Sequence, residues 1–296
     1  PVGQERAHAA LVVQLAQQAA PGARVAARVH AVDHPAFADD MAVIAGEAGQ
    51  HLCHIMVPKV ESVDDVLRAE QALLRAGAAH LPLHVLIESP AAVQQAFAIA
   101  AHPRVQSISF GLMDFVSAHG GAIPASAMGV AGQFSHPLVV RAKLEIAAAC
   151  HAHGKVPSHC VVTEFTDASA MHAAASRAAS ELGYTRMWSI HPAQIRPILA
   201  AFAPAQGEVE QAARILSAAA AADWAPIRPA ARCPRPCSAG SMMDPLLLSR
   251  RNRHEIVPRL RIAAGPRLGS GPGCARQVCQ ACCQGAVHQD QRQGRA

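Results

Sequence analysis

The sequence predicts an α/β protein with an incomplete TIM (β/α)8-type barrel of about six recognisable strands, followed by an irregular C-terminal tail. Two observations predict it. Short runs rich in Val and Ile alternate with Ala-rich stretches of helical periodicity. A polar or charged residue also stands at or just past the end of nearly every run. Strands separated by helices favour parallel pairing, and barrel strand ends converge on the face that carries the site.

The expected elements follow in chain order. We expect strands at residues 24–29, 53–58, 83–88, 105–110, 156–162 and 185–190. We expect helices at residues 62–76, 91–101, 137–153 and 168–182. An open doubly wound sheet is the alternative, but no Gly-rich phosphate-binding segment follows the first strand. The first residues have helical character and no strand precedes them, so we expect one or two N-terminal β/α units to be missing from the barrel.

Composition and charge set the domain organisation. With 296 residues, 51% of them hydrophobic and 16% charged, the chain can bury a substantial core. No apolar run approaches the roughly 18 residues of a spanning helix, so we expect a cytoplasmic protein that does not bind a membrane. Residues 1–224 hold 14 Lys and Arg against 18 Asp and Glu, whereas residues 225–296 hold 12 against 3. We therefore expect a barrel domain at residues 1–228 and an Arg/Cys/Pro-rich, disordered tail at residues 229–296.

The tail admits other interpretations. Its last four cysteines, with His288, invite a zinc site, but the C-x4-C-x2-C-C spacing is not a paired CxxC framework. Its twelve arginines invite nucleic-acid binding, but no aromatic residue lies among them to stack on bases. We expect neither ligand. An out-of-frame or recombined extension is a further hypothesis, which alignment of the coding DNA in all three frames tests.

The polar residues at the strand ends are the candidates for a site. In chain order they are Arg28, His30, Lys59, Glu61, Glu88, Asp114, His159, Glu164 and His191. Glu88 and Asp114 end adjacent strands, which lie about 5 Å apart, so their carboxylates can share one ligand. A cation such as Mg2+ takes one or two protein carboxylates and leaves its other positions to water and substrate. The alternative is that each acid caps the helix that follows it.

Arg28 is the second candidate of this edge. It closes a strand of apolar residues, where a guanidinium is costly unless it meets an anion. A bidentate clamp on a substrate carboxylate is one interpretation. A salt bridge to Asp33, Asp39 or Asp40 is the other.

The remaining polar residues favour structural roles. Lys59 and Glu61 can pair with each other or with neighbouring strands. The 17 histidines are scattered and show no H-E-x-x-H spacing. His191 is expected to order a strand-to-helix turn, because Pro192 stands at the expected helix start.

Assembled in this order, the chain resembles the aldolase/citrate lyase family, in particular the beta subunit of citrate lyase and related CoA-ester lyases. The resemblance lies in "ARVHAVDHPAFADDMAVI", "IMVPKVESVDDV", "VLIESPAAVQQAFAIAAHPRVQSISFGLMDF", "HPLVVRAKLEIAAACHAHGKVPSH" and "RMWSIHPAQIRPILAAFAPAQGEVEQAARIL". It runs in order from about residue 5 to 228, and the combination is more specific than any one piece. It implies a TIM barrel with Mg2+ as cofactor. Glu88 and Asp114 would bind the metal, Arg28 and Glu88 the substrate, and all three are the implied catalytic residues.

The resemblance also implies a reaction, the reversible cleavage of a 3-hydroxyacyl-CoA such as citryl-CoA or malyl-CoA into acetyl-CoA and a 2-oxo acid. It implies a homo-oligomer, a trimer or a hexamer. Asp244 in "GSMMDP" is a candidate for the catalytic acid that the family's C-terminal region supplies to a neighbouring subunit, and a chance match is the alternative.

The chain departs from the family pattern at several positions. Ser89, Pro90 and Ala91 follow Glu88, where the family usually has Thr and then a small or basic residue. His30 and His159 stand where Asn and Asp are common. Because two strands are also expected to be missing, a catalytically impaired barrel or a non-enzymatic, partner-binding remnant is the alternative function.

Overall fold

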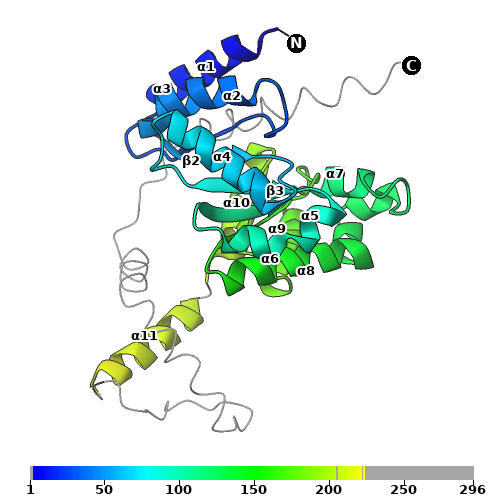
Figure 1. Cartoon of the computed structure of the whole chain (residues 1–296). Coiled ribbons are helices and arrows are strands. Elements are labelled where there is room, and N and C mark those ends of the chain that lie inside the picture. Colours follow the sequence, from blue (N-terminus) through cyan, green and yellow to red (C-terminus); the bar gives the residue numbers. More distant parts are fainter. Residues whose placement is uncertain (1–2, 205, 222, 224–296) are drawn as a thin grey trace. The chain divides into compact units, whose positions relative to one another are not determined.

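The computed structural model describes residues 3–204, 206–221 and 223. Its centre is one sheet of six parallel strands in the order β1-β2-β3-β4-β5-β6 (Figure 1). The strands are β1 Val25–Arg28, β2 Leu52–Val57, β3 Leu83–Ile87, β4 Val105–Phe110, β5 Val156–His159 and β6 Arg186–Met187. Each strand pairs with the next along the chain, as in a β/α barrel. Among the described residues β1 and β6 do not pair with each other, so the sheet is a half-barrel.

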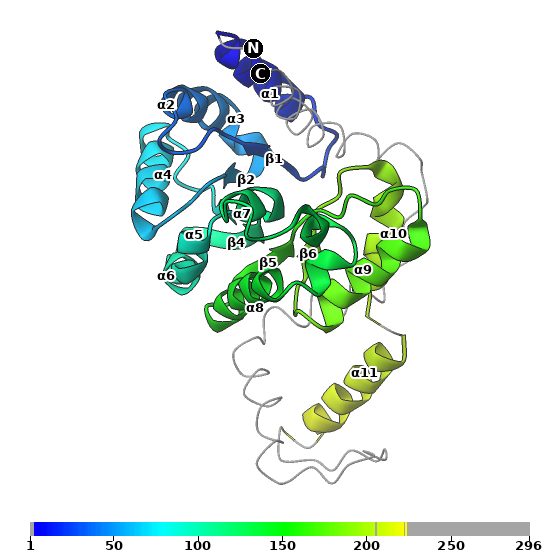
Figure 2. The ribbon, with the colours of Figure 1, turned by 90° about the vertical axis from the view of Figure 1, so that its right-hand side faces the viewer.

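The helices of the described residues are α1 Glu5–Gln17, α2 Phe37–Asp40, α3 Gly46–Ala48, α4 Val63–Arg75, α5 Pro90–Gln94, α6 Ala96–Ala101, α7 Leu112–Ser117, α8 Pro137–Ala152, α9 Ala168–Ser180, α10 Pro192–Phe202 and α11 Gln206–Ala221. Of these, α4, α6 and α8 cover the outer face of the sheet (Figure 2). A π-helical turn, Met41–Ala45, joins α2 to α3. Shorter 3-10 turns lie at Gly49–His51, Ala125–Met128 and Gly132–Phe134.

Local sequence explains where these elements begin and end. Helix α4 begins at a capping box: the Ser62 side chain accepts a hydrogen bond from the backbone N–H of Asp65, and the Asp65 side chain accepts one from the backbone N–H of Ser62. All six predicted strands are present, although β6 has only two residues. The single helix expected at residues 91–101 was wrong: it is interrupted at Gln95, whose φ of −90° and ψ of 0° separate α5 from α6.

The domain prediction reaches beyond the described residues. Residues up to Ala203 form one compact unit, and α11 belongs to a second. Residues 229–296, with Asp244 and the tail cysteines, lie outside the described residues, so the boundary at residue 228 stays a prediction. None of the helices in the described part is both long and apolar enough to cross a membrane.

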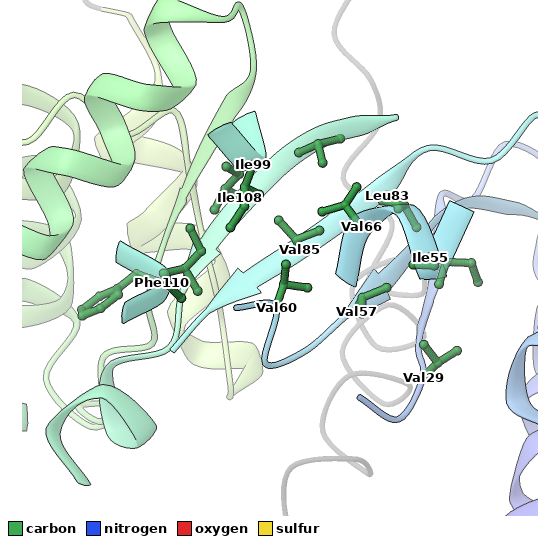
Figure 3. Packing of buried hydrophobic residues seen from close by; sticks show 14 of the residues in the cluster. Val29, Ile55, Val57, Val60, Val66, Leu83, Val85, Ile99, Ile108 and Phe110 are labelled. Atoms are coloured by element: carbon green, nitrogen blue, oxygen red, sulfur yellow. The ribbon is translucent and has the colours of Figure 1, made fainter. Parts of the chain in front are cut away.

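The hydrophobic core lies between the outer face of the sheet and the helices that cover it. Side chains at every second position of the strands are buried there, because successive residues of a strand point to opposite faces. Figure 3 shows Val57, Val85 and Ile108 from three neighbouring strands in one layer with Val66 of α4 and Ile99 of α6. Each such side chain contributes about 1.5–3 kcal/mol when it leaves water. This layer fixes the register of the strands and therefore the height at which each one ends.

The inner face carries polar residues instead. His84 Nδ1 lies 2.6 Å from Ser107 Oγ, and His84 Nε2 lies 2.7 Å from Ser109 Oγ. Trp188 Nε1, just past β6, donates to Ser109 Oγ at 2.6 Å. The chain of hydrogen bonds links β3, β4 and the end of β6 across the concave side of the sheet. Burial lowers the pKa of His84 to about 3, with a smaller contribution from the neighbouring His54.

His84 makes the stability of the fold sensitive to acid. Its pKa is depressed on folding, so the unfolded chain binds a proton below about pH 6.5 that the folded chain does not. The contribution of His84 to stability is therefore complete above pH 6.5 and is lost as the pH is lowered toward 3. We expect the free energy of unfolding, measured by urea titration, to lose up to about 1.4 kcal/mol per pH unit from this group.

Two variants check the assignment. In His84→Gln the slope of stability against pH decreases between pH 6.5 and 4.5, even if stability at pH 7 is lower. The solvent-exposed His172→Gln is the matched control and leaves the slope unchanged. An equal slope in His84→Gln and the wild type would contradict the assignment.

Candidate active site at the carboxyl edge of the sheet

Glu88 is the buried centre of this edge. It follows β3 directly, and its relative exposure is 9%. Its Oε2 accepts a hydrogen bond from the backbone N–H of Lys59, at 3.0 Å. Glu88 does not cap the next helix, because Ser89 is the N-cap of α5 and its hydroxyl accepts from Ala92 N. The capping alternative for Glu88 is therefore wrong.

Asp114 reaches the same edge from β4. In the parallel register Ile87 lies opposite Phe110, so β3 and β4 end at the same height. Gly111 follows β4 and begins α7, and Asp114 lies exposed in the first turn of that helix. This position benefits from the helix dipole, as the capping alternative expected, although the side chain makes no cap hydrogen bond.

Gly111 allows Glu88 to lie where it does. A Cβ at Gly111 would lie 2.5 Å from Glu88 Oε1 and closer still to Cγ. No other residue type fits there without displacing the carboxylate. Glu88 is thus held between the amide of Lys59 on one side and the bare backbone of Gly111 on the other.

The charges of this edge act on one another. Burial raises the pKa of Glu88, and the nearby negative charge of Asp114 raises it further. The Lys59 amide and the positive charges of Lys59 and Arg28 act in the opposite direction. The structure therefore brings together the three residues that the sequence proposed, with Lys59 as a fourth.

Arg28 lies at the end of β1, exposed and paired in register with Met56 of β2. The predicted alternative was a salt bridge to a nearby aspartate. Asp40 instead accepts from the backbone N–H of His30 at 2.9 Å and lies 2.6 Å from its Nδ1. Within the described residues, Arg28 forms no ion pair within 4.0 Å, which leaves its guanidinium available to an anion.

Two other strand-end residues serve local structure. His191 caps α10 by accepting from Ala193 N at 3.2 Å, as predicted. Glu164 accepts from the backbone N–H groups of Thr166 and Asp167 in the turn before α9. A hydrogen bond from the Thr166 hydroxyl, followed by these two backbone hydrogen bonds, lowers the pKa of Glu164 to about 2.

His159 faces the outer helices rather than this edge. Its ring stacks on that of Phe134, with 5.3 Å between the ring centroids. The ammonium of Lys143 lies 4.4 Å from the centroid of the Phe134 ring. Lys143 is fully buried and donates to the backbone and side-chain oxygens of Gln133. The expectation that every strand-end polar residue converges on one face was therefore wrong for His159.

The donor set suits a small divalent cation. Among the described residues, no group of three or more His, Cys, Asp and Glu side chains is placed to hold a metal ion, so the protein ligands available at this edge are two carboxylates. One buried and one exposed carboxylate match Mg2+, which takes one or two protein carboxylates and keeps several positions for water or substrate. A cation there would also relieve the repulsion that Asp114 exerts on the buried Glu88.

Known proteins share much of this sequence and its fold. Residues 3–192 match the sequence profile of the HpcH/HpaI aldolase/citrate lyase family. The chain belongs to this family. An L-malyl-CoA/beta-methylmalyl-CoA lyase of Cereibacter sphaeroides is 32% identical over 213 residues, which are 66% of this chain and 65% of that protein. The chain thus spans slightly less than two thirds of the length of such curated relatives.

Solved structures of the family share the fold. A citrate lyase of Burkholderia xenovorans LB400 is 42% identical and superimposes with a TM-score of 0.73, covering 94% of this chain and 84% of that one. A citrate lyase beta subunit of M. tuberculosis, complexed with oxaloacetate and magnesium, is 25% identical with a TM-score of 0.51, covering 60% of this chain and 73% of that one. The family fold and the predicted barrel class are confirmed.

The burial of Glu88 has a measurable cost. Because its pKa is raised on folding, the unfolded chain loses this proton at lower pH than the folded chain, and the contribution of Glu88 to stability becomes less favourable as the pH rises above about 4.5. We expect Glu88→Gln to raise the midpoint of thermal unfolding at pH 7, without added metal, by roughly 2–4 °C. The gain should vanish near pH 4. The exposed Glu47→Gln is the control, and a Glu88→Gln protein that is less stable at every pH would contradict this account.

Proposed function

We propose that the chain is a Mg2+-dependent carbon–carbon lyase that cleaves a 3-hydroxyacyl-CoA, of the citryl-CoA or malyl-CoA type, into acetyl-CoA and a 2-oxo acid. The observation that carries the proposal is the Glu88–Asp114 pair together with Arg28, which has no ion-pair partner among the described residues, in a chain of this family. The names and ligands of the relatives support the substrate class. They include a malyl-CoA lyase and a beta subunit bound to oxaloacetate and magnesium.

Each residue has a distinct role in this proposal. Glu88 and Asp114 are the metal ligands, and Mg2+ on them would polarise the substrate carbonyl and stabilise negative charge on its oxygen. Arg28 is the substrate-binding residue that orients the acid by a bidentate hydrogen bond to its carboxylate. The Lys59 amide and Gly111 keep Glu88 in one place, so that its carboxylate needs no rearrangement when the ligand binds.

Location and assembly are part of the proposal. The family membership supports a cytoplasmic homo-oligomer, a trimer or a hexamer, whose ligands are an acyl-CoA and a 2-oxo acid. The proposal includes neither nucleic acid nor a membrane as a partner. A catalytically impaired barrel that binds a partner is the alternative, and the assay that follows separates the two.

The test is an assay of the purified chain with Mg2+ and citryl-CoA or malyl-CoA, with chemical trapping of the released 2-oxo acid. We expect turnover that EDTA abolishes and excess Mg2+ restores. Asp114→Asn should lower kcat/KM by about a hundredfold or more, because one of two metal ligands is lost. Turnover that is insensitive to EDTA or to Asp114→Asn would contradict the lyase assignment, and a folded protein without turnover would favour the alternative.

The substitution Gly111→Ala tests the site without changing any charge. Gly111→Ala places a methyl group against the Glu88 side chain, so the Glu88 carboxylate must leave its position. We expect Mg2+ affinity, measured by calorimetry, to fall by about tenfold, within the range for residues that hold metal ligands in place. Gly46→Ala is the matched control, because its Cβ meets only ordinary contacts of 3.5 Å or more. Equal affinities in the two variants would show that Gly111 does not position Glu88.

A further inference from the structure

Lys59 adopts a backbone conformation that a lysine rarely takes. Its φ is +52°, and the only other non-glycine residue with positive φ among the described residues is Asp223. The left-handed region is unfavourable for side chains with a Cβ and is normally occupied by Gly, Asn or Asp. Such conformations persist where the surrounding structure requires them, and they concentrate at functional sites.

With Lys59 in this conformation, the β2–α4 turn forms hydrogen bonds to the end of β3. The Lys59 N–H donates to Glu88 Oε2 at 3.0 Å, and the next N–H, that of Val60, donates to Leu86 O at 3.1 Å. One residue further, Glu61 accepts from the Ser89 hydroxyl at 2.5 Å. The Lys59 side chain therefore starts at the rim of the site, and it is exposed.

The acids around Lys59 are engaged elsewhere. Glu61 accepts from Ser89, and Asp65 accepts from the backbone of Glu61 and Ser62 and pairs with Arg68. The predicted Lys59–Glu61 pair is not formed. No ion pair within 4.0 Å involves Lys59 in the described part of the chain. Its charge and that of Arg28 both act on Glu88, so two cations without a carboxylate partner stand at this edge.

We propose that Lys59 is a second anion-binding residue of the site, which holds a different anionic group of the substrate from the one that Arg28 holds. The inference rests on the proposed function and narrows its substrate class to acids whose oxo-acid half carries two carboxylates. With Mg2+ on Glu88 and Asp114, the four side chains and the metal would carry two surplus positive charges. A 2-oxo dicarboxylate balances that charge, whereas a 2-oxo monocarboxylate leaves one cation unpaired.

The backbone role of Lys59 does not explain its ammonium group. Glycine would donate the same N–H to Glu88 with less backbone strain. A lysine at this position therefore indicates that the side chain has a use of its own. The two roles can be separated, because Lys59→Met removes the charge and keeps a long unbranched side chain, while Lys59→Gly removes the charge and relieves the strain.

The test is calorimetric binding of oxaloacetate and of pyruvate to the full chain saturated with Mg2+. We expect the wild type to bind oxaloacetate about fivefold more tightly than pyruvate, which corresponds to the upper end for one exposed charge pair. Lys59→Met and Lys59→Gly should each bring this ratio near one, with pyruvate affinity unchanged within about twofold. Arg75→Met is the control for net charge, since Arg75 is exposed at the far end of α4, about 18 Å along the helix, and it should keep the wild-type ratio.

The outcomes separate this inference from the proposed function. A wild-type ratio that persists in Lys59→Gly overturns the role of Lys59 and leaves the lyase proposal intact. A wild type that shows the Lys59-dependent ratio but cleaves no acyl-CoA supports the anion site and overturns the lyase proposal. A wild type that binds neither oxo acid overturns the role of Lys59 directly.

Discussion

Glu88 is a carboxylate buried to nine-tenths beside a second carboxylate, and the carboxyl edge of the sheet is organised around holding it there. Taking a charge out of water is costly unless hydrogen bonds or opposite charges compensate. The Lys59 amide donates a hydrogen bond to Glu88, and the positive charges of Arg28 at the end of β1 and Lys59 after β2 favour its ionised form. Gly111 after β4 leaves room for the side chain. A divalent cation would neutralise the repulsion that remains between the Glu88 and Asp114 carboxylates.

The alternation of the strands makes this placement possible. Residues on one face of β2, β3 and β4 are apolar and pack under α4, α6 and α8, so the strands cannot slip in register. The other face carries His84 and Ser109, which with Trp188 link β3, β4 and the end of β6 by hydrogen bonds. Both layers set the heights at which β3 and β4 end. The separation of Glu88 from Asp114 therefore depends on packing well below the site.

Much of this arrangement could be predicted from the sequence. Six Val- and Ile-rich runs between helical stretches were enough for the parallel sheet, and their shared direction was enough to bring Glu88, Asp114 and Arg28 to one edge. The orientation of individual strand-end residues was not predictable. His159 ends β5 as Glu88 follows β3, yet it points to the outer helices, because a shift of one residue reverses the face of a strand.

Other features depended on backbone geometry that pattern does not encode. Nothing in "VPKVES" distinguishes a lysine in the left-handed region from one in an extended loop, so the contact of the Lys59 amide with Glu88 was missed. The acid after β3 also looked like a helix cap, and only the structure shows that the neighbouring serine has that role. The glycine in "SFGLMDF" was visible as a turn residue, but its reason, the approach of a side chain from the adjacent strand, was not.

The most direct test of the central claim is the position of a bound metal ion. Crystals of the chain grown with Mn2+ in place of Mg2+ would locate the ion by its anomalous scattering. The account predicts one ion at the carboxyl edge, about 2.0–2.2 Å from one oxygen of Glu88 and one of Asp114, with its other positions open to water or an oxo acid. A fully occupied ion that contacts only one of the two carboxylates, or an edge without an ion at saturating Mn2+, would contradict it.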